Sequence, residues 1–186
     1  MVMPMKDSKS AQTFHRFTIP VFIRTLQNIS KILVMAERHA KRHGIDPVTL
    51  LSSRLYPDMF TLLQQVQYLC FIPVDFAKNF SAIAAPRVGY DEASFADLKA
   101  SIKLTIAYLR GVKPQDVKAR GDAPLPLFFD ESIGLPAESH ATRMTLPDFF
   151  FHATVAYAIL RHNGVPLGKA DFIGPLGAVR LKKKKR

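Results

Sequence analysis

The sequence has one cysteine, no tryptophan and no apolar run long enough for a membrane helix. Cys70 alone excludes a disulfide within the chain and any cysteine-rich zinc or iron–sulfur site, and it suits a reducing compartment. Residues 1–10 lack the apolar core of a signal peptide. The longest apolar stretch, residues 149–160, contains His152 and reaches only about two-thirds of the ~20 residues that a membrane helix needs. We therefore expect an intracellular, cytoplasmic protein with no membrane span.

Positive charge dominates the composition, with a formal net charge of +11. Six of these charges lie between Arg180 and Arg186 with no acid among them, and a net two more lie before Pro20. The body of the chain therefore carries only +3, which is close to balance. Because a nucleic-acid interface needs basic residues gathered on the fold itself, we do not expect the folded body to bind nucleic acid. The tail is compatible with nuclear import, with tethering to an anionic surface or with a role in solubility.

The length of 186 residues, with 48% apolar and 22% charged residues, indicates one globular domain. Apolar residues recur at three- and four-residue spacing over residues 20–43, 57–84, 94–111 and 147–163, which predicts four main helices around one core. Pro73 is expected to kink or split the second helix. The run from Leu125 to Phe129 predicts a short strand, half of a β-hairpin between the third and fourth helices. We expect a flexible segment over residues 1–18, an all-α bundle over 19–174 and a basic tail over 175–186.

One block of sequence resembles a known family. It runs from Phe149 to His152 and from Ala156 to Phe172, and it is similar to the domain-of-unknown-function family numbered one-nine-nine-three. Shorter matches are the segments Ile19–Phe22, Arg54–Met59 and Gln65–Gln67, so the resemblance covers roughly residues 17–174. It implies a four-helix bundle of the DinB/YfiT-like superfamily, in which dimers are common. That superfamily includes metal-dependent thiol transferases and isomerases, but the resemblance implies no established reaction for this branch.

The chain departs from the metal-binding members of that superfamily. Those members typically use three histidines, one on the second helix and an HxxxH pair on the last helix. Here the residue four positions after His152 is Ala156, and Phe76 stands where many relatives carry a histidine in an Asp-His-Ala-Lys run. Residues 124–144 and the basic tail also differ from the family pattern. We therefore expect no metal and no other cofactor.

His152 is the strongest candidate for a catalytic residue, because an imidazole on an apolar helix must find a hydrogen-bond partner or a ligand. It could be a general base or a metal ligand in a bundle pocket, or a structural histidine bonded to a carbonyl or carboxylate. Gln67 and Asp75 lie about two turns apart and within about 80° on one side of the second predicted helix. They are candidates to assist His152, although both could equally face solvent. Gln65 is a further polar residue on that helix.

Four further residues are candidates for substrate binding: Asp58, Tyr157, Arg161 and His162. Asp58 could instead stabilise the start of the second helix, and Arg161 and His162 could instead cap the end of the fourth. His39 and His43 have the spacing that can place two imidazoles on one metal ion, but the surrounding basic residues favour a solvated helix end.

Together with the resemblance, these residues favour a metal-independent small-molecule enzyme, of the isomerase, cyclase or dehydratase type, in which His152 transfers a proton. The alternative is a non-catalytic protein that binds a small ligand or acts as a dimeric interaction partner; we expect a homodimer in either case. An enclosed pocket that joins His152 to another polar side chain would favour the enzyme. A pocket filled by Phe76 and neighbouring phenylalanines would favour the non-catalytic protein.

Overall fold

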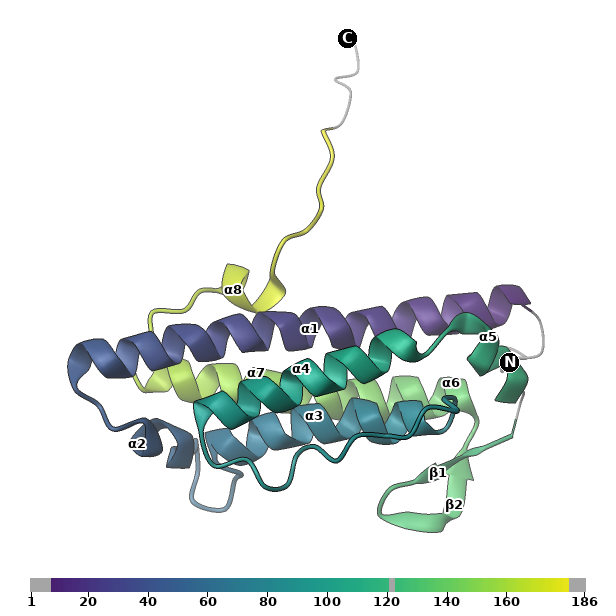
Figure 1. Cartoon of the computed structure of the whole chain (residues 1–186), viewed down its shortest axis with the longest axis horizontal. Coiled ribbons are helices and arrows are strands. Elements are labelled where there is room, and N and C mark those ends of the chain that lie inside the picture. The colour runs from purple at the N-terminus through teal and green to yellow at the C-terminus, as the bar shows by residue number, and fades with distance from the viewer. Residues whose placement is uncertain (1–7, 121–122, 181–186) are drawn as a thin grey trace.

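The computed structural model describes residues 8–120 and 123–180, so expectations for residues 1–7 and for residues 181–186 of the basic tail lie outside the described residues. Four long helices form the bundle (Figure 1): α1 (Ser8–His43), α3 (Leu62–Lys78), α4 (Phe95–Gly111) and α7 (Leu146–His162). Shorter helices are α2 (Pro47–Ser52), α5 (Pro114–Arg120), α6 (Ala137–His140), the π-helical turn η1 (Ala141–Thr145) and α8 (Lys169–Ile173). Strands β1 (Leu125–Leu127) and β2 (Asp130–Leu135) form an antiparallel hairpin. The predicted all-α bundle with a short hairpin between its third and fourth main helices is confirmed.

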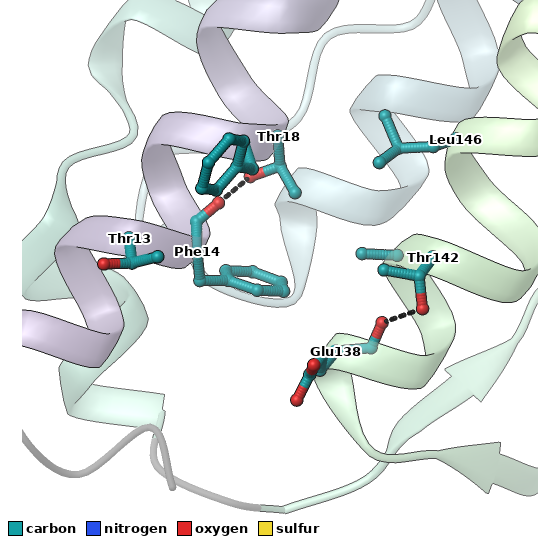
Figure 2. Close-up of a pocket in the computed structure, with 8 residues that line it drawn as sticks. Thr13, Phe14, Thr18, Glu138, Thr142 and Leu146 are labelled. Carbon is teal, nitrogen blue, oxygen red and sulfur yellow. Dashed lines mark hydrogen bonds between the residues drawn. The ribbon is translucent and has the colours of Figure 1, made fainter. Parts of the chain in front are cut away.

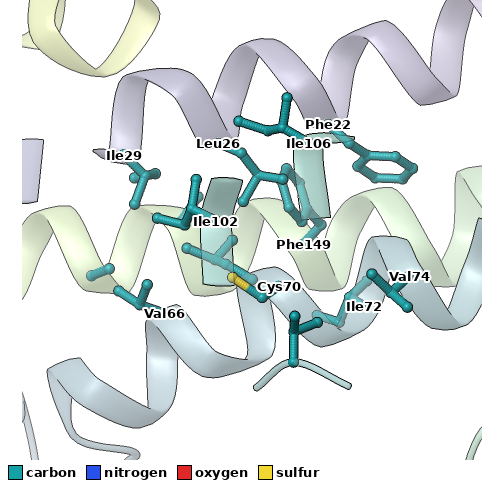
Figure 3. Packing of buried hydrophobic residues seen from close by; sticks show 14 of the residues in the cluster. Phe22, Leu26, Ile29, Val66, Cys70, Ile72, Val74, Ile102, Ile106 and Phe149 are labelled. Atoms are coloured by element: carbon teal, nitrogen blue, oxygen red, sulfur yellow. The ribbon is translucent and has the colours of Figure 1, made fainter. Parts of the chain in front are cut away.

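The core lies where the four long helices meet. Leu26 of α1, Cys70 of α3 and Phe149 of α7 point into it, together with Ile102 of α4 (Figure 3). Burying an aliphatic or aromatic side chain of this size stabilises a fold by roughly 1.5–3 kcal/mol. Burial also raises the pKa of the Cys70 thiol to about 12, so this cysteine is an inert core residue.

Helix α1 begins earlier than the sequence predicted. Residues 8–18, which we expected to be flexible, are helical, and the helix continues through Pro20. The reason is tertiary packing: Phe14 is buried against Phe76 and Phe80, at 5.9 and 5.6 Å between ring centroids. The ring of His15 is also held, at 2.9 Å from the carbonyl oxygen of Val112. A polar segment without a periodic apolar stripe can thus be helical when a few of its side chains pack into the core of the fold.

By length and composition alone, α1 could cross a membrane. Half of its most apolar window, however, is buried inside the bundle. Phe22 and Leu26 face the other helices, while Arg24 and Lys31 lie on the exposed side. This is the burial pattern of an amphipathic helix that packs one face on the core of a bundle.

Helix α3 is shorter at both ends than the predicted range of 57–84. It starts after Thr61, whose side chain accepts a hydrogen bond from the Gln64 N–H, while the Gln64 side chain accepts one from the Thr61 N–H. It ends at Lys78, where the Asn79 side chain donates to the carbonyl oxygens of Asp75 and Phe76. Pro73 lies inside the helix without splitting it. The periodic pattern located the helix, and local capping set its ends.

The buried carboxylate of Glu92 holds the segment that precedes α4 in place by hydrogen bonds. Glu92 Oε1 accepts hydrogen bonds from the Gly89 N–H, at 2.8 Å, and from the Ser101 hydroxyl. The side chain of Gln67 donates to the Glu92 carbonyl oxygen at 3.2 Å. Burial alone would raise the pKa of Glu92, but the hydrogen bonds from Ser101 and Gly89 outweigh it and hold the pKa below the ordinary 4.5. The ionised carboxylate thus ties this segment to α4, and the Glu92 backbone carbonyl ties it to α3.

We expect Glu92→Gln to lower the free energy of unfolding at pH 7 by about 1.5–3 kcal/mol, the range for hydrogen bonds to a charged group. Unfolded Glu92 takes up its proton near pH 4.5 and folded Glu92 only at lower pH. The contribution of Glu92 is therefore complete above that range and is lost as the pH falls through its folded pKa. Urea unfolding of both proteins from pH 7 down to pH 3 should show the difference between their free energies of unfolding becoming smaller. A difference that stays constant over this range would contradict the ionised, hydrogen-bonded state of Glu92.

Candidate functional site

His152 is buried in α7 and has a partner on α3. Its Nδ1 lies 2.6 Å from Gln65 Oε1. The Gln65 amide nitrogen donates to the Phe60 carbonyl oxygen at 3.3 Å, which fixes the amide so that its oxygen faces the ring. The imidazole therefore donates from Nδ1, and Nε2 is the nitrogen free for other contacts.

Asp148 lies on the other side of the imidazole, one helical turn earlier in α7. Its Oδ1 is 3.4 Å from His152 Nε2. The Asp148 side chain is 31% exposed, whereas those of His152 and Gln65 are buried. We call Asp148, His152 and Gln65 the polar triad. The triad runs from the protein surface into the bundle.

Aromatic rings surround the imidazole of the triad. Phe60 stacks on His152 with 6.0 Å between ring centroids and 17° between the planes. Tyr68 lies at 5.0 Å, and Phe151 meets the ring edge-on at 5.4 Å. These rings keep water from the imidazole, and a low local dielectric strengthens its polar contacts.

Asp148 opens onto a narrow cleft between α3, η1, α7 and the hairpin. Its lining residues are Phe71, Ile72, Asp75, Phe76, Phe128, His140, Met144, Thr145 and Asp148. Asp75 of α3 lines the same cleft as Asp148 of α7, and Asp75 is paired with Lys78 at 2.5 Å. The cleft has a volume of about 10 Å³, which is room for one water molecule.

His140 joins the hairpin to η1 at the edge of this cleft. Its Nε2 lies 3.2 Å from the Pro126 carbonyl oxygen and its Nδ1 lies 2.8 Å from Thr145 Oγ1. Burial lowers the pKa of His140 below 6.5, and the Pro126 carbonyl offsets only part of that shift. The neutral ring donates from Nε2 to the carbonyl and accepts at Nδ1 from the threonine hydroxyl. Both nitrogens are used, so His140 is a structural histidine that holds the cleft wall.

The two residues predicted to assist His152 do not contact it. Gln67 faces away from α7 and binds the Glu92 carbonyl oxygen. Asp75 pairs with Lys78, and it shares the cleft with Asp148 rather than touching the imidazole. The amide that meets His152 belongs to Gln65, which is two residues from Gln67 and so on nearly the opposite side of α3.

The predicted substrate-binding residues are spread over the surface. Asp58 lies exposed in the turns before α3, and Thr61 caps the helix instead. Tyr157 packs on Phe172 of α8 at 5.6 Å between ring centroids. Arg161 and His162 are exposed at the end of α7, where the Arg161 guanidinium donates to the Val165 carbonyl oxygen at 3.4 Å. The structure does not bring these four residues together with the triad.

Asp148 was not selected from the sequence, although its spacing from His152 indicated it. Asp148 precedes His152 by four positions, the spacing that puts two side chains on one face of a helix. The residue four positions after His152, Ala156, is buried in the core. Gln65 could not be chosen over Gln67 from the sequence, because the polar pattern of the helix did not show which side meets α7.

The residues around His152 do not fit a three-histidine metal centre. Its Nδ1 is bonded to an amide oxygen, and Asp148 is the one charged side chain that opposes Nε2. Over residues 8–120 and 123–180, no three histidine, cysteine, aspartate or glutamate side chains converge as in a metal site. Phe76, expected in place of a ligand, packs among Phe14, Phe22, Phe80 and His140, and it also lines the cleft onto which Asp148 opens.

A second, larger cavity lies between the N-terminal half of α1 and the α6–η1–α7 segment (Figure 2). Its volume is about 210 Å³, and its lining residues are Thr13, Phe14, Phe17, Thr18, Glu138, Ala141, Thr142 and Leu146. The Thr18 hydroxyl donates to the Phe14 carbonyl oxygen and the Thr142 hydroxyl to the Glu138 carbonyl oxygen, at 2.9 and 2.7 Å. With these two hydroxyls occupied, the wall is mostly apolar, and Glu138 is the charged residue at its edge. We call it the apolar pocket.

Comparison with known proteins places the chain in a family. The model of the family described as Domain of unknown function (DUF1993) matches residues 14–173. The crystal structure of a DinB family member protein from Shewanella denitrificans is similar, with 29% sequence identity and a TM-score of 0.87 over 94% of this chain and 99% of that chain. No curated protein matches the chain. The chain therefore belongs to the DUF1993 family and has the fold of the DinB/YfiT-like four-helix bundles.

Proposed function

We propose that the chain is a small-molecule enzyme that moves a proton in the Asp148 cleft by metal-independent acid–base chemistry, in a reaction of the isomerase, cyclase or dehydratase type. The observation that supports the proposal is the polar triad, which links a partly exposed carboxylate through a buried imidazole to an amide. Acid–base catalysis needs a group that reaches the substrate and a partner that holds the proton in a fixed geometry.

Each member of the triad has a separate task in this proposal. Asp148 reaches the cleft, so its carboxylate takes a proton from the bound substrate. His152 Nε2, 3.4 Å away, shares that proton when the pair tightens around the ligand, as catalytic hydrogen bonds often do. Gln65 accepts from Nδ1 and so keeps Nε2 turned toward Asp148. The same pair then returns the proton to a second atom of the substrate.

Access to the cleft is controlled by the hairpin. Phe128, between β1 and β2, lies edge-on to Phe71 at 5.9 Å between ring centroids and narrows the cleft to the size of one water molecule. A carbonyl compound therefore enters only when Phe128 moves away from Phe71. Asp75, across the cleft from Asp148, then provides a second polar contact that orients the substrate.

The proposal is tested by hydrogen–deuterium exchange on small molecules. The untagged protein is incubated in D₂O with a panel of small aldehydes, ketones and 2-oxo acids, and loss of the C–H signals next to the carbonyl is followed by NMR. We expect exchange in at least one compound, and we expect Asp148→Asn and His152→Gln each to slow it by about 100-fold or more. His162→Gln changes an exposed histidine of the same helix and should keep the full rate. No exchange in any compound, or full exchange in the Asp148 and His152 variants, would contradict the proposal.

The apolar pocket supports the alternative of a non-catalytic ligand-binding protein. Its volume of about 210 Å³ exceeds that of cavities known to bind benzene. Phe14, Phe17, Ala141 and Leu146 make up its apolar wall, and the hydroxyls of Thr18 and Thr142 are already bonded. The ligand in that case is an uncharged apolar compound. The two functions separate in the same NMR experiment: naphthalene would shift the signals of Phe17 and Leu146, while the carbonyl panel would give no exchange.

A further inference from the structure

Two histidines lie together at the end of α1, on a different helix from the polar triad. His39 and His43 are one turn apart, and their ring centroids are 4.4 Å from each other. His43 is exposed and His39 is half-buried, with its Nε2 facing the loop at Gly164, where an added Cβ would lie 3.8 Å from it. Residues four apart on a helix share a face, so both imidazoles can reach one point in space.

Both imidazoles have nitrogens available for a ligand. Within the described part of the chain, the contact of His39 and His43 with each other is the one side-chain interaction that either ring makes. His15, His140 and His152, in contrast, each use a ring nitrogen on a protein oxygen. Neutral imidazole nitrogens are preferred ligands of zinc, copper and nickel.

The charges near the pair act in opposite directions. The pair lies in the last turns of α1, where unpaired carbonyl groups give the helix a partial negative charge that favours cations. Arg38, Lys41 and Arg42 are exposed beside it and repel a cation. Salt screens the charges of exposed side chains, whereas the metal–nitrogen bonds do not depend on it.

We propose that His39 and His43 together bind one divalent transition-metal ion, with water completing its coordination. The proposal is independent of the function assigned to the Asp148 cleft. Two imidazoles with open remaining positions should follow the usual order of affinity, with Cu²⁺ above Ni²⁺ and Zn²⁺. Because the neighbouring residues are cationic, added salt should strengthen binding.

The test uses the untagged full chain and Cu²⁺. Equilibrium dialysis followed by elemental analysis should give one copper per chain, and the electron paramagnetic resonance spectrum should show coupling to two imidazole nitrogens. His39→Ala and His43→Ala should each lose the bound copper. Raising sodium nitrate from about 0.1 M to about 1 M shortens the screening length from about 10 Å to about 3 Å and should lower the dissociation constant.

Two further variants locate the site. Arg42→Gln removes a neighbouring positive charge and should bind copper more tightly. His152→Gln should bind it as the unmodified chain does, since the triad is elsewhere in the bundle. Copper retained in either His39→Ala or His43→Ala, or lost in His152→Gln, would overturn the proposal. Circular dichroism of each variant checks that the helices are intact.

Discussion

Phe76→Ala is expected to lower the free energy of unfolding by about 3–5 kcal/mol, the usual cost of removing a buried phenylalanine ring. Phe76 is 1% exposed. Its ring lies 5.9 Å from that of Phe14, 5.8 Å from that of Phe22 and 5.2 Å from that of Phe80. Removing it leaves a cavity between α1 and α3 that the rigid helices cannot close, so both burial and ring contacts are lost.

The matched control is Phe129→Ala. Phe129 is a phenylalanine that is 66% exposed at the hairpin, and its loss should change the free energy of unfolding by less than about 0.5 kcal/mol. Guanidinium unfolding followed by circular dichroism measures both variants. Equal small losses would mean that Phe76 is not part of the tightly packed core.

Gln65→Met is expected to cost about 1–3 kcal/mol of the free energy of unfolding, because it leaves the buried Nδ1–H of His152 without an acceptor. Methionine has nearly the length of glutamine, so the change removes the amide and keeps the volume. Replacing both partners, in Gln65→Met with His152→Leu, removes the unsatisfied donor as well. The double variant should therefore lose less stability than the sum of the two single variants.

Urea unfolding of the four proteins gives the interaction energy as a double-mutant cycle. Gln67→Met combined with His152→Leu is the matched control, because Gln67 binds the Glu92 carbonyl oxygen and does not contact the imidazole. That control pair should be additive within about 0.5 kcal/mol. Additive losses for Gln65 and His152 would show that the 2.6 Å contact does not hold the ring in solution.

Most of the fold could be predicted from the sequence because helix periodicity is a local property. The apolar periodicity over residues 94–111 predicted α4, and in the structure the Ser94 hydroxyl at its start accepts a hydrogen bond from the Asp97 N–H at 3.1 Å. The early start of α1 could not be predicted in this way. Its first turns depend on Phe14 packing against Phe76 and Phe80, which are more than sixty residues away in the sequence.

The candidate site was only half predictable for the same reason. His152 was found because a polar residue on an apolar helix needs a partner, and Asp148 could have been found from its spacing of four residues. The choice of Gln65 over Gln67, and the place of Asp75 beside Asp148 in the cleft, depend on how α3 is rotated against α7. Helix rotation is fixed by the packing of all core side chains together.

The sequence by itself determined the helical class, the family resemblance and the choice of His152 as a candidate residue, since each rests on residue type and spacing along one segment. Only the tertiary structure decided which groups contact the His152 imidazole and that Phe76 packs in the core. It also decided that an apolar pocket lies between α1 and the α6–η1–α7 segment. These contacts join residues far apart in the chain, and no local pattern encodes the rotation and approach of one helix against another.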